Sequence, residues 1–168
     1  MSDINYLSKK LNTTTLQFVL FTILTAGIYP VIWLYKTSQL IETETQQVVF
    51  HPYYYIVASV LLGWEMALGD ARLVMSMGSD FYGFSMILSK VYFIVLIVWA
   101  FKAKSILQMY YLKMHGIDIK PNAFYTLIFS VYYINFLINS ISEIKEKSDL
   151  VQKAYLQNEK KVNHENEK

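Results

Sequence analysis

The sequence has no cysteine and little charge. Without cysteine among its 168 residues, neither a disulfide framework nor thiolate chemistry is available. Charged residues make up 17% of the chain and hydrophobic residues 54%, whereas a soluble domain usually has about 25% charged and about 45–50% apolar residues. The net charge of +2 is too small to indicate nucleic acid as a partner.

The motifs of common enzymes are also absent. The sequence contains no H-E-x-x-H, no G-x-S-x-G and no P-loop, and its six glycines are scattered. The three histidines, His51, His115 and His164, lack the spacing of metal ligands. We therefore expect the protein not to be an enzyme and to hold no metal and no cofactor.

Long charge-free runs are the dominant feature of the chain. Leu11–Tyr35, Thr45–Trp64 and Pro121–Ser142 contain no Asp, Glu, Lys or Arg, and each reaches the roughly 20 residues that a helix needs to cross a bilayer. The apolar stretch Val91–Phe101 is too short to cross, unless its helix begins near Phe81. The sequence thus predicts an all-α polytopic membrane protein with four transmembrane helices, at Thr13–Tyr35, Pro52–Leu68, Phe81–Phe101 and Pro121–Ile141.

Residues 1–142 form the predicted four-helix transmembrane domain, and residues 143–168 form a polar C-terminal tail. Glu143 and Lys147 have the i, i+4 spacing and order that stabilise a helix. We expect a helix that continues out of the fourth span and frays after about Asn158.

Two segments of the chain are similar to each other. When Ile32–Ile41 is aligned with Val98–Leu107, tryptophans and lysines coincide and Tyr35 falls opposite Phe101. A true repeat would give two helix pairs pointing the same way, but a chance match remains an alternative. Aromatic rings prefer the headgroup level and lysines reach into water. We therefore interpret the following residues as interface anchors: Trp33, Tyr35, Lys36, Trp99 and Lys102.

The segment Ala103–Gly116 has the pattern of an amphipathic helix. Its apolar residues recur at i, i+3, i+4, i+7, i+8 and i+11, and Gly116 is a suitable residue to end the helix. We expect this helix to lie flat in the membrane interface. The alternative is that the third span simply continues outward as one long helix.

Two ionisable residues fall inside the predicted spans. Glu65 and Lys90 lie at similar depth in spans two and three, which a short connection joins into a hairpin. A charge inside a bilayer usually faces the interior of the bundle and is paired. The sequence predicts a Glu65–Lys90 ion pair, or else two side chains that reach separately for the headgroups. Asp70 and Arg72 crowd the same end and form either part of an ion pathway or an ordinary polar turn.

Small and amide side chains indicate helix contacts. Ser59 and Gly63 form a small-xxx-small pair on the second span, and Asn135 and Asn139 lie on one face of the fourth. Such residues let helices approach closely and hydrogen bond to each other. We expect a homodimer.

The first predicted span resembles the opening of a family of small bacterial inner-membrane proteins with a domain of unassigned function. Its pattern T-x-G-I-Y-x-x-x-W-x-Y-K is matched by Thr25, Gly27, Ile28, Tyr29, Trp33, Tyr35 and Lys36, with Pro30 as a departure. The family's closing Y-I-N-x-x-I-N is matched by Tyr133, Ile134, Asn135, Ile138 and Asn139. The resemblance implies a multi-pass protein of the bacterial inner membrane and implies no substrate.

The expected function is that of a non-enzymatic membrane protein. It would act as a homo-oligomer, or as an accessory subunit of an unidentified membrane protein, and affect envelope physiology such as membrane potential. The alternative is a small ion or proton conductor that uses Glu65 and Lys90. Basic residues favour cytoplasmic termini by only six to five. Those on the side of the termini are Lys9, Lys10, Arg72, Lys145, Lys147 and Lys153, and those opposite are Lys36, Lys102, Lys104, Lys113 and Lys120.

Overall fold

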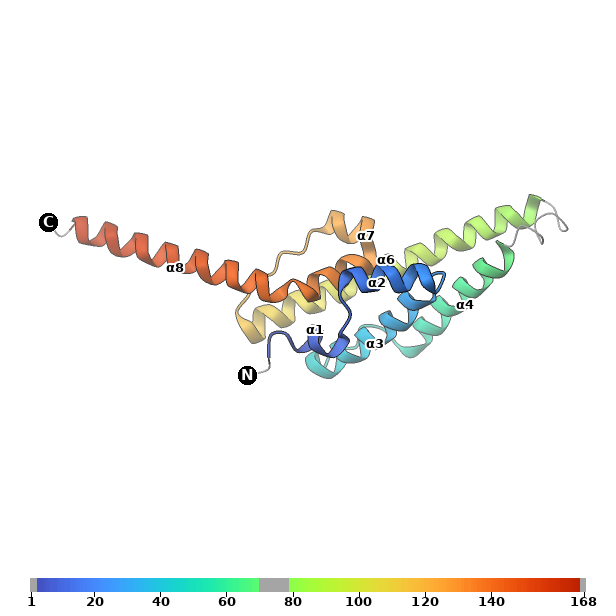
Figure 1. The fold of residues 1–168 in the computed structure, drawn as a ribbon, viewed down its shortest axis with the longest axis horizontal. Coiled ribbons are helices and arrows are strands. Elements are labelled where there is room, and N and C mark those ends of the chain that lie inside the picture. Colours follow the sequence, from blue (N-terminus) through green and yellow to red (C-terminus); the bar gives the residue numbers. More distant parts are fainter. Residues whose placement is uncertain (1–2, 70–78, 167–168) are drawn as a thin grey trace.

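The predicted all-α class is confirmed. The computed structural model describes residues 3–69 and 79–166, and all regular secondary structure in these ranges is helical (Figure 1). The helices are α1 (Tyr6–Leu11), α2 (Thr15–Leu24), α3 (Ile28–Thr45), α4 (Pro52–Leu68), α6 (Ser79–His115), α7 (Ala123–Asn139) and α8 (Ile141–Asn166).

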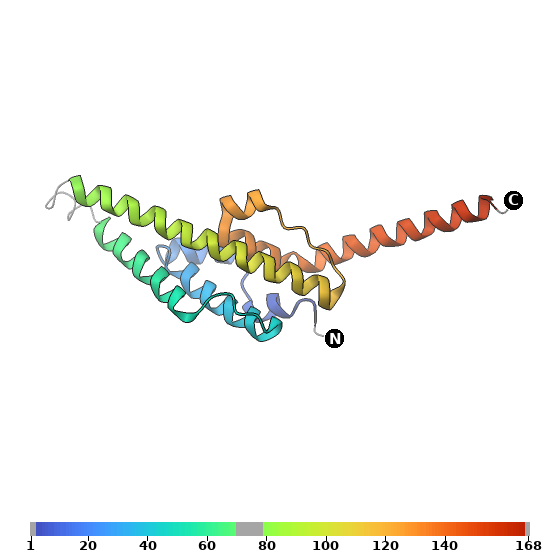
Figure 2. The same ribbon diagram turned by 180° about the vertical axis from the view of Figure 1, so that it is seen from behind.

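The second predicted span has the bounds of α4, which runs antiparallel beside α6 (Figure 2). Pro52 is the first helical residue, where its missing N–H is not needed. The Tyr54 hydroxyl donates a hydrogen bond to the carbonyl of Val95 in α6. The helix pair extends beyond the remaining helices, toward the end of the molecule that carries residues 69 and 79.

The predicted interfacial helix at Ala103–Gly116 is wrong, and its alternative is right. The segment is the last part of α6, a single helix of 37 residues and about 55 Å. Its apolar stripe packs into the core against α3 and α7, which removes this surface from the membrane interface. Gly116 ends the helix with a φ of 67°. The buried residues of the stripe are Ala103, Ile106, Leu107, Tyr110 and Tyr111.

The first predicted span is not one helix, because the chain turns back between α2 and α3. Ala26 and Gly27 have φ values of 49° and 91°, which no α-helix accepts. The rings of Phe18 and Trp33 lie 4.9 Å apart, although a straight helix would separate 15 residues by about 22 Å. Pro30 falls in the first turn of α3, where proline is tolerated, and α2 and α3 form a helical hairpin.

The fourth predicted span is also broken. Ser130, inside α7, has a φ of 45° and a ψ of −119°, so that the helix bends sharply there. The rings of Tyr125 and Tyr133 lie 5.9 Å apart across this bend. Ser140 then separates α7 from α8, and the axes of Ala123–Asn139 and Ile141–Val151 differ by 58°.

The core lies where α3, α6 and α7 meet. Trp33 and Trp99 are almost fully buried, and their rings make an edge-to-face contact at 6.0 Å. The Trp99 indole N–H donates to the Ser38 hydroxyl at 2.8 Å, which satisfies a donor that has no access to water. Segments from both halves of the chain therefore share one core.

One helix of the described chain, Gly83–His115 within α6, is long and apolar enough to cross a membrane. The bent pair formed by Ala123–Asn139 and Ile141–Val151 passes the same test only when both helices are taken together. The N-terminus, the end of α3 and the end of α6 gather at one end of the molecule, from which α8 extends (Figure 1).

Candidate functional site

A hollow between α1 and α3, which we call the lysine cavity, has a volume of about 420 Å³. Two lysines, three residues with hydroxyl groups and one amide line it together with apolar side chains, so that it is both cationic and hydrophobic. Its residues are Lys10, Leu11, Thr13, Tyr29, Ile32, Trp33, Tyr35, Lys36, Gln39 and Leu40.

The α3 wall of the lysine cavity follows from helical spacing. Tyr29, Trp33, Lys36 and Leu40 recur at i, i+4, i+7 and i+11 and therefore share one face. Residues of α1 form the facing wall, and the buried side chain of Leu7 anchors that helix to the core. The α2–α3 turn is what brings the two walls together, because a continuous first span would carry Lys36 far from α1.

The segment between α1 and α2 is fixed from two sides. The side-chain amides of Asn135 and Asn139 both donate to the Thr13 carbonyl, at 3.2 and 3.0 Å. The Thr13 hydroxyl forms a hydrogen bond of 3.1 Å with the Tyr29 hydroxyl on α3. This network joins α7, the α1–α2 segment and α3, and it holds the rim of the lysine cavity in place.

The charge of the lysine cavity is uncompensated within the described chain. Lys10 and Lys36 are exposed, and neither forms an ion pair with a residue that the structure describes. The neighbouring Lys9 instead pairs with Asp3 at 2.6 Å, and this hydrogen bond holds the pKa of Asp3 below its usual range. Among the residues that the structure describes, none that lines the cavity is acidic. It therefore suits a ligand that carries negative charge.

An apolar groove between α3 and α4 adjoins the lysine cavity. It has a volume of about 410 Å³, and Ile32 and Tyr35 line both hollows. We call it the α3–α4 groove. Its other residues are Val31, Pro52, Tyr55, Ile56 and Ser59.

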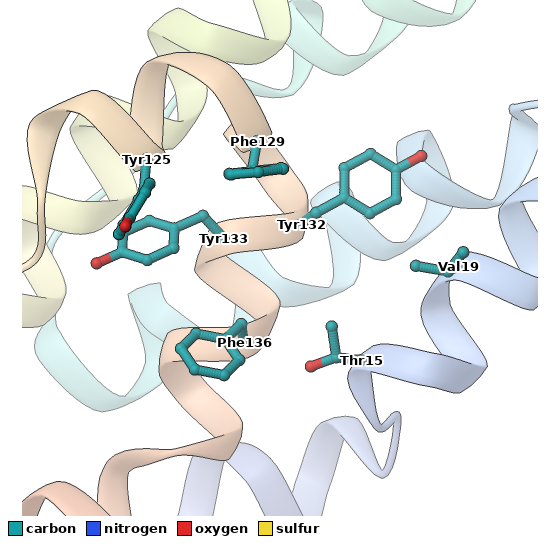
Figure 3. A pocket seen from close by; sticks show the side chains of 7 residues that line it. All are labelled: Thr15, Val19, Tyr125, Phe129, Tyr132, Tyr133 and Phe136. Carbon is teal, nitrogen blue, oxygen red and sulfur yellow. The ribbon is translucent and has the colours of Figure 1, made fainter.

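A third hollow, of about 380 Å³, lies between α2 and the bend of α7. Figure 3 shows rings from both halves of α7 on one side and two residues of α2 on the other. Its lining is almost wholly apolar and carries no charged side chain, so it suits a hydrocarbon chain. The residues are Thr15, Val19, Tyr125, Phe129, Tyr132, Tyr133 and Phe136.

The predicted Glu65–Lys90 ion pair is not formed. The Glu65 carboxylate accepts a hydrogen bond of 2.8 Å from the hydroxyl of Ser89, while Lys90 is exposed. Adjacent residues of a helix point about 100° apart, so that Ser89 faces α4 and Lys90 faces away. The predicted partners Asp70 and Arg72 lie outside the described residues.

The predicted interface anchors divide into two groups. Trp33 and Trp99 are not surface anchors, because the contact between α3 and α6 buries both rings in the core. Tyr35 and Lys36 are exposed and line the lysine cavity. Lys102 is exposed, with its ammonium group 4.5 Å from the centre of the Phe50 ring.

The predicted helix-contact residues also divide. Asn135 and Asn139 bond within the chain. Ser59 and Gly63 instead lie exposed on α4, and a Cβ added to Gly63 would meet no atom within 4 Å. The face of α4 that carries this small-residue pair is therefore open in the single chain.

Sequence reasoning missed the roles of Lys10, Thr13 and Gln39, because a single first span would place Lys36 and the N-terminal residues on opposite sides. The one available signal was Gly27 followed by Pro30, which favours a break in a helix.

The fold and the hollows define the chain as a helical protein with one helix able to cross a bilayer, or two if the bent pair is one span. Comparison with known proteins adds nothing to this class: no protein-family model, no curated protein and no solved structure matches the chain. The family resemblance noted in the sequence therefore stays a prediction.

Proposed function

We propose that the protein is a non-enzymatic component of the bacterial inner membrane, which acts by contact with lipid and with other membrane proteins. The observation that carries this proposal is the amount of exposed apolar surface. Isolated apolar residues are normal on a soluble surface, but long contiguous faces are not. These faces include Leu16, Leu20, Ile23 and Leu24 of α2, Ile56, Val60 and Trp64 of α4, Ile87, Phe93 and Ile94 of α6, and Phe124, Ile128 and Phe129 of α7.

In the proposed arrangement α4 and α6 cross the membrane, and the α2–α3 hairpin and bent α7 enter it from one side only. The 17 residues of α4 reach about 25 Å, at the lower end of what a span requires. The 10 residues of α2 reach about 15 Å, or half of the hydrocarbon layer. This arrangement replaces the four full spans expected from the sequence.

The distribution of lysines favours a cytoplasmic location for the end that carries the termini. Helix α1, which carries Lys9 and Lys10, lies at that end, together with α8 and the last part of α6, which carry further lysines (Figure 1), and Lys36 lines a cavity with Lys10. Basic residues next to spans are enriched on the cytoplasmic side. Both termini are therefore proposed to be cytoplasmic, as the sequence also indicated.

We propose a homodimer through α4 as the form in which the protein acts, or a complex with an unidentified membrane protein on the same face. Ser59 and Gly63 would allow the backbone of a second helix to approach closely. The open surface at Gly63 supports this proposal, because nothing within the described chain occupies it. An effect on membrane potential would follow from the partner rather than from a pathway within one chain.

No observation favours the alternative of an ion conductor. That hypothesis required Glu65 and Lys90 to face each other inside the bundle, whereas Glu65 bonds to Ser89 and Lys90 is exposed. An ion flux in liposomes that Glu65→Gln abolishes would restore it.

Single-cysteine labelling tests the arrangement directly, because the native chain contains no cysteine. Lys9→Cys and Lys36→Cys should both react with a membrane-impermeant maleimide only when the cytoplasmic face is accessible. Gly83→Cys, near the start of α6, should react only from the opposite face, and Ala58→Cys, which is buried, is the unreactive control. Labelling of Lys9→Cys and Lys36→Cys from opposite faces would restore the full first span. Release of the protein from membranes by alkaline carbonate would refute membrane embedding altogether.

A further inference from the structure

We propose that the lysine cavity and the α3–α4 groove together bind one anionic phospholipid, with its phosphate headgroup at Lys10 and Lys36 and an acyl chain along the groove. The proposal rests on the membrane location proposed above. It goes further by assigning a specific lipid site, which differs from general contact with the bilayer in its position and in its selectivity for charge.

The cationic part of the site fits a phosphate diester. Lys10 and Lys36 come from two different helices and line one hollow that has no acidic residue. Neither lysine is neutralised by a described side chain. Hydrogen bonds between charged partners are shorter and stronger than neutral ones, and a lysine close to an anionic lipid contributes about fivefold in affinity. The cavity therefore offers two such contributions to one headgroup.

Polar groups beside the lysines match the remainder of a headgroup. The Gln39 amide lines the cavity, and so do the paired hydroxyl groups of Thr13 and Tyr29. Asn135 and Asn139 fix the position of Thr13 from behind, so that the rim is held in place before a ligand arrives. A site organised in advance loses less freedom on binding, which increases affinity.

The apolar part of the site distinguishes a lipid from a free phosphate. Ile32 and Tyr35 line both hollows, so a molecule with its headgroup in the cavity can continue into the groove without crossing a polar surface. Pro52 and Ile56 line the α4 side of this groove and are exposed. A soluble anion would leave the groove unused, whereas an acyl chain would fill it.

The location of the site agrees with the chemistry of the membrane. The lysine cavity lies at the end of the molecule proposed to face the cytoplasm, and the groove runs from it along α3 and α4 into the proposed hydrocarbon layer. In the cytoplasmic leaflet, anionic lipids attract basic residues next to the membrane. The occupant proposed here is therefore a lipid of that leaflet.

Quenching of tryptophan fluorescence by brominated lipid tests this site. We would use the full chain with Trp64→Phe and Ile56→Trp, because Trp64 is exposed outside the site, Trp33 and Trp99 are buried, and Ile56 lines the groove. Phosphatidylglycerol with brominated acyl chains is titrated into delipidated protein in a mild detergent. The tryptophan of Ile56→Trp, which lies beside the proposed acyl chain, should be quenched at saturation. Lys10→Gln or Lys36→Gln should weaken binding by about fivefold, and the two together by about 25-fold.

The matched control is Lys113→Gln, an exposed lysine outside both hollows, which should leave affinity within about twofold of the parent. Brominated phosphatidylcholine should bind at least tenfold more weakly than phosphatidylglycerol. Glycerol 3-phosphate, which has no acyl chain, should bind at least about 100-fold more weakly than phosphatidylglycerol, because each buried CH₂ group adds to affinity. Far-ultraviolet circular dichroism confirms that each variant is folded.

Three results would overturn the proposal. The first is a double lysine variant that binds phosphatidylglycerol like Lys113→Gln, since the lysines would then not form the site. The second is equal binding of both phospholipids, which indicates hydrocarbon contact alone. The third is displacement of the lipid by millimolar inorganic phosphate, which identifies a site for a soluble anion. Each is distinct from failure of membrane embedding, which labelling and carbonate extraction measure without reference to lipid type.

Discussion

Removal of the two asparagines that hold Thr13 should destabilise the fold more than the sum of the single changes. In Asn135→Ala or Asn139→Ala the Thr13 carbonyl keeps one donor, and the loss should be about 0.6–1.5 kcal/mol. In the double variant the carbonyl has no side-chain donor, although Thr13 is only 7% exposed. A buried group without a partner costs about 1–3 kcal/mol more. The Asn139 amide also donates to the side-chain oxygen of Asn135 at 3.1 Å, and each single change already breaks this bond, which lowers the coupling. We therefore expect a coupling energy of about 0.5–1 kcal/mol.

The assay is reversible unfolding in mixed micelles of detergent and dodecyl sulfate, followed by circular dichroism. A double-mutant cycle isolates the coupling, because loss of side-chain volume contributes to each single change and cancels. Ser105→Ala, an exposed residue that bonds only to its own helix, is the control and should change stability by under about 0.5 kcal/mol. Additivity within about 0.3 kcal/mol would show that the shared carbonyl does not couple the two amides.

Three further changes test other parts of the structure. Ser38→Ala should destabilise the protein by about 1–3 kcal/mol in the same unfolding assay, because the buried Trp99 N–H loses its acceptor; no change would mean that another acceptor replaces it. Gly27→Ala should lower the free energy of unfolding by about 1–2 kcal/mol, because alanine adopts a φ of 91° poorly. A clash is not the cause, since the nearest atom to the new Cβ is 3.8 Å away. Stability equal to that of the parent would contradict the turn. The pKa of Glu143 lies below its usual value because its carboxylate accepts a hydrogen bond from Lys147. The contribution of this pair to stability is therefore present above the unfolded pKa and is lost as the pH falls through the folded pKa. Lys147→Gln should raise the Glu143 pKa in a carboxyl NMR titration, and an unchanged pKa would show that the pair is absent in solution.

The helix that the sequence predicted best is α4, which has clear end signals. Pro52 begins it and Gly69 follows it, so that the charge-free run and the terminal residues agreed. The all-α class followed from charge-free runs of the length that a membrane-crossing helix needs. The path of the chain between helices was harder to predict, because a charge-free run of suitable length indicates a helix but not whether that helix turns back.

The two breaks illustrate this difference. Gly27 and Pro30 were visible as residues that a helix accepts poorly, yet the length of the run favoured one span. Ser130 carries no such signal, since serine is common within helices that face a protein interior. Its φ of 45° is imposed by packing of α7 against α2 and α6, and such tertiary contacts cannot be read from one sequence.

The candidate site was only partly predictable for the same reason. Tyr29, Trp33, Tyr35 and Lys36 were identified as a motif, but their predicted role was an interface anchor and a family signature. The facing wall from α1 depends entirely on the turn at Gly27. The Glu65–Lys90 prediction had the correct helices and the correct depth, and it failed by one residue, because Ser89 rather than Lys90 faces Glu65.

The α2–α3 turn also changes how the basic residues divide between the two sides of the membrane. With a full first span, Lys36 lies opposite Lys9 and Lys10, and the basic residues split six to five. In the proposed arrangement the chain returns before Lys36, so that this lysine, the lysines in the last part of α6 and Lys120 lie on the same side as the termini. The side with the termini then holds every basic residue of that division that lies within the described part of the chain. Because basic residues near spans determine orientation, the hairpin turns a nearly balanced distribution into a strongly asymmetric one. The same turn that brings the walls of the lysine cavity together would therefore also favour the orientation proposed above.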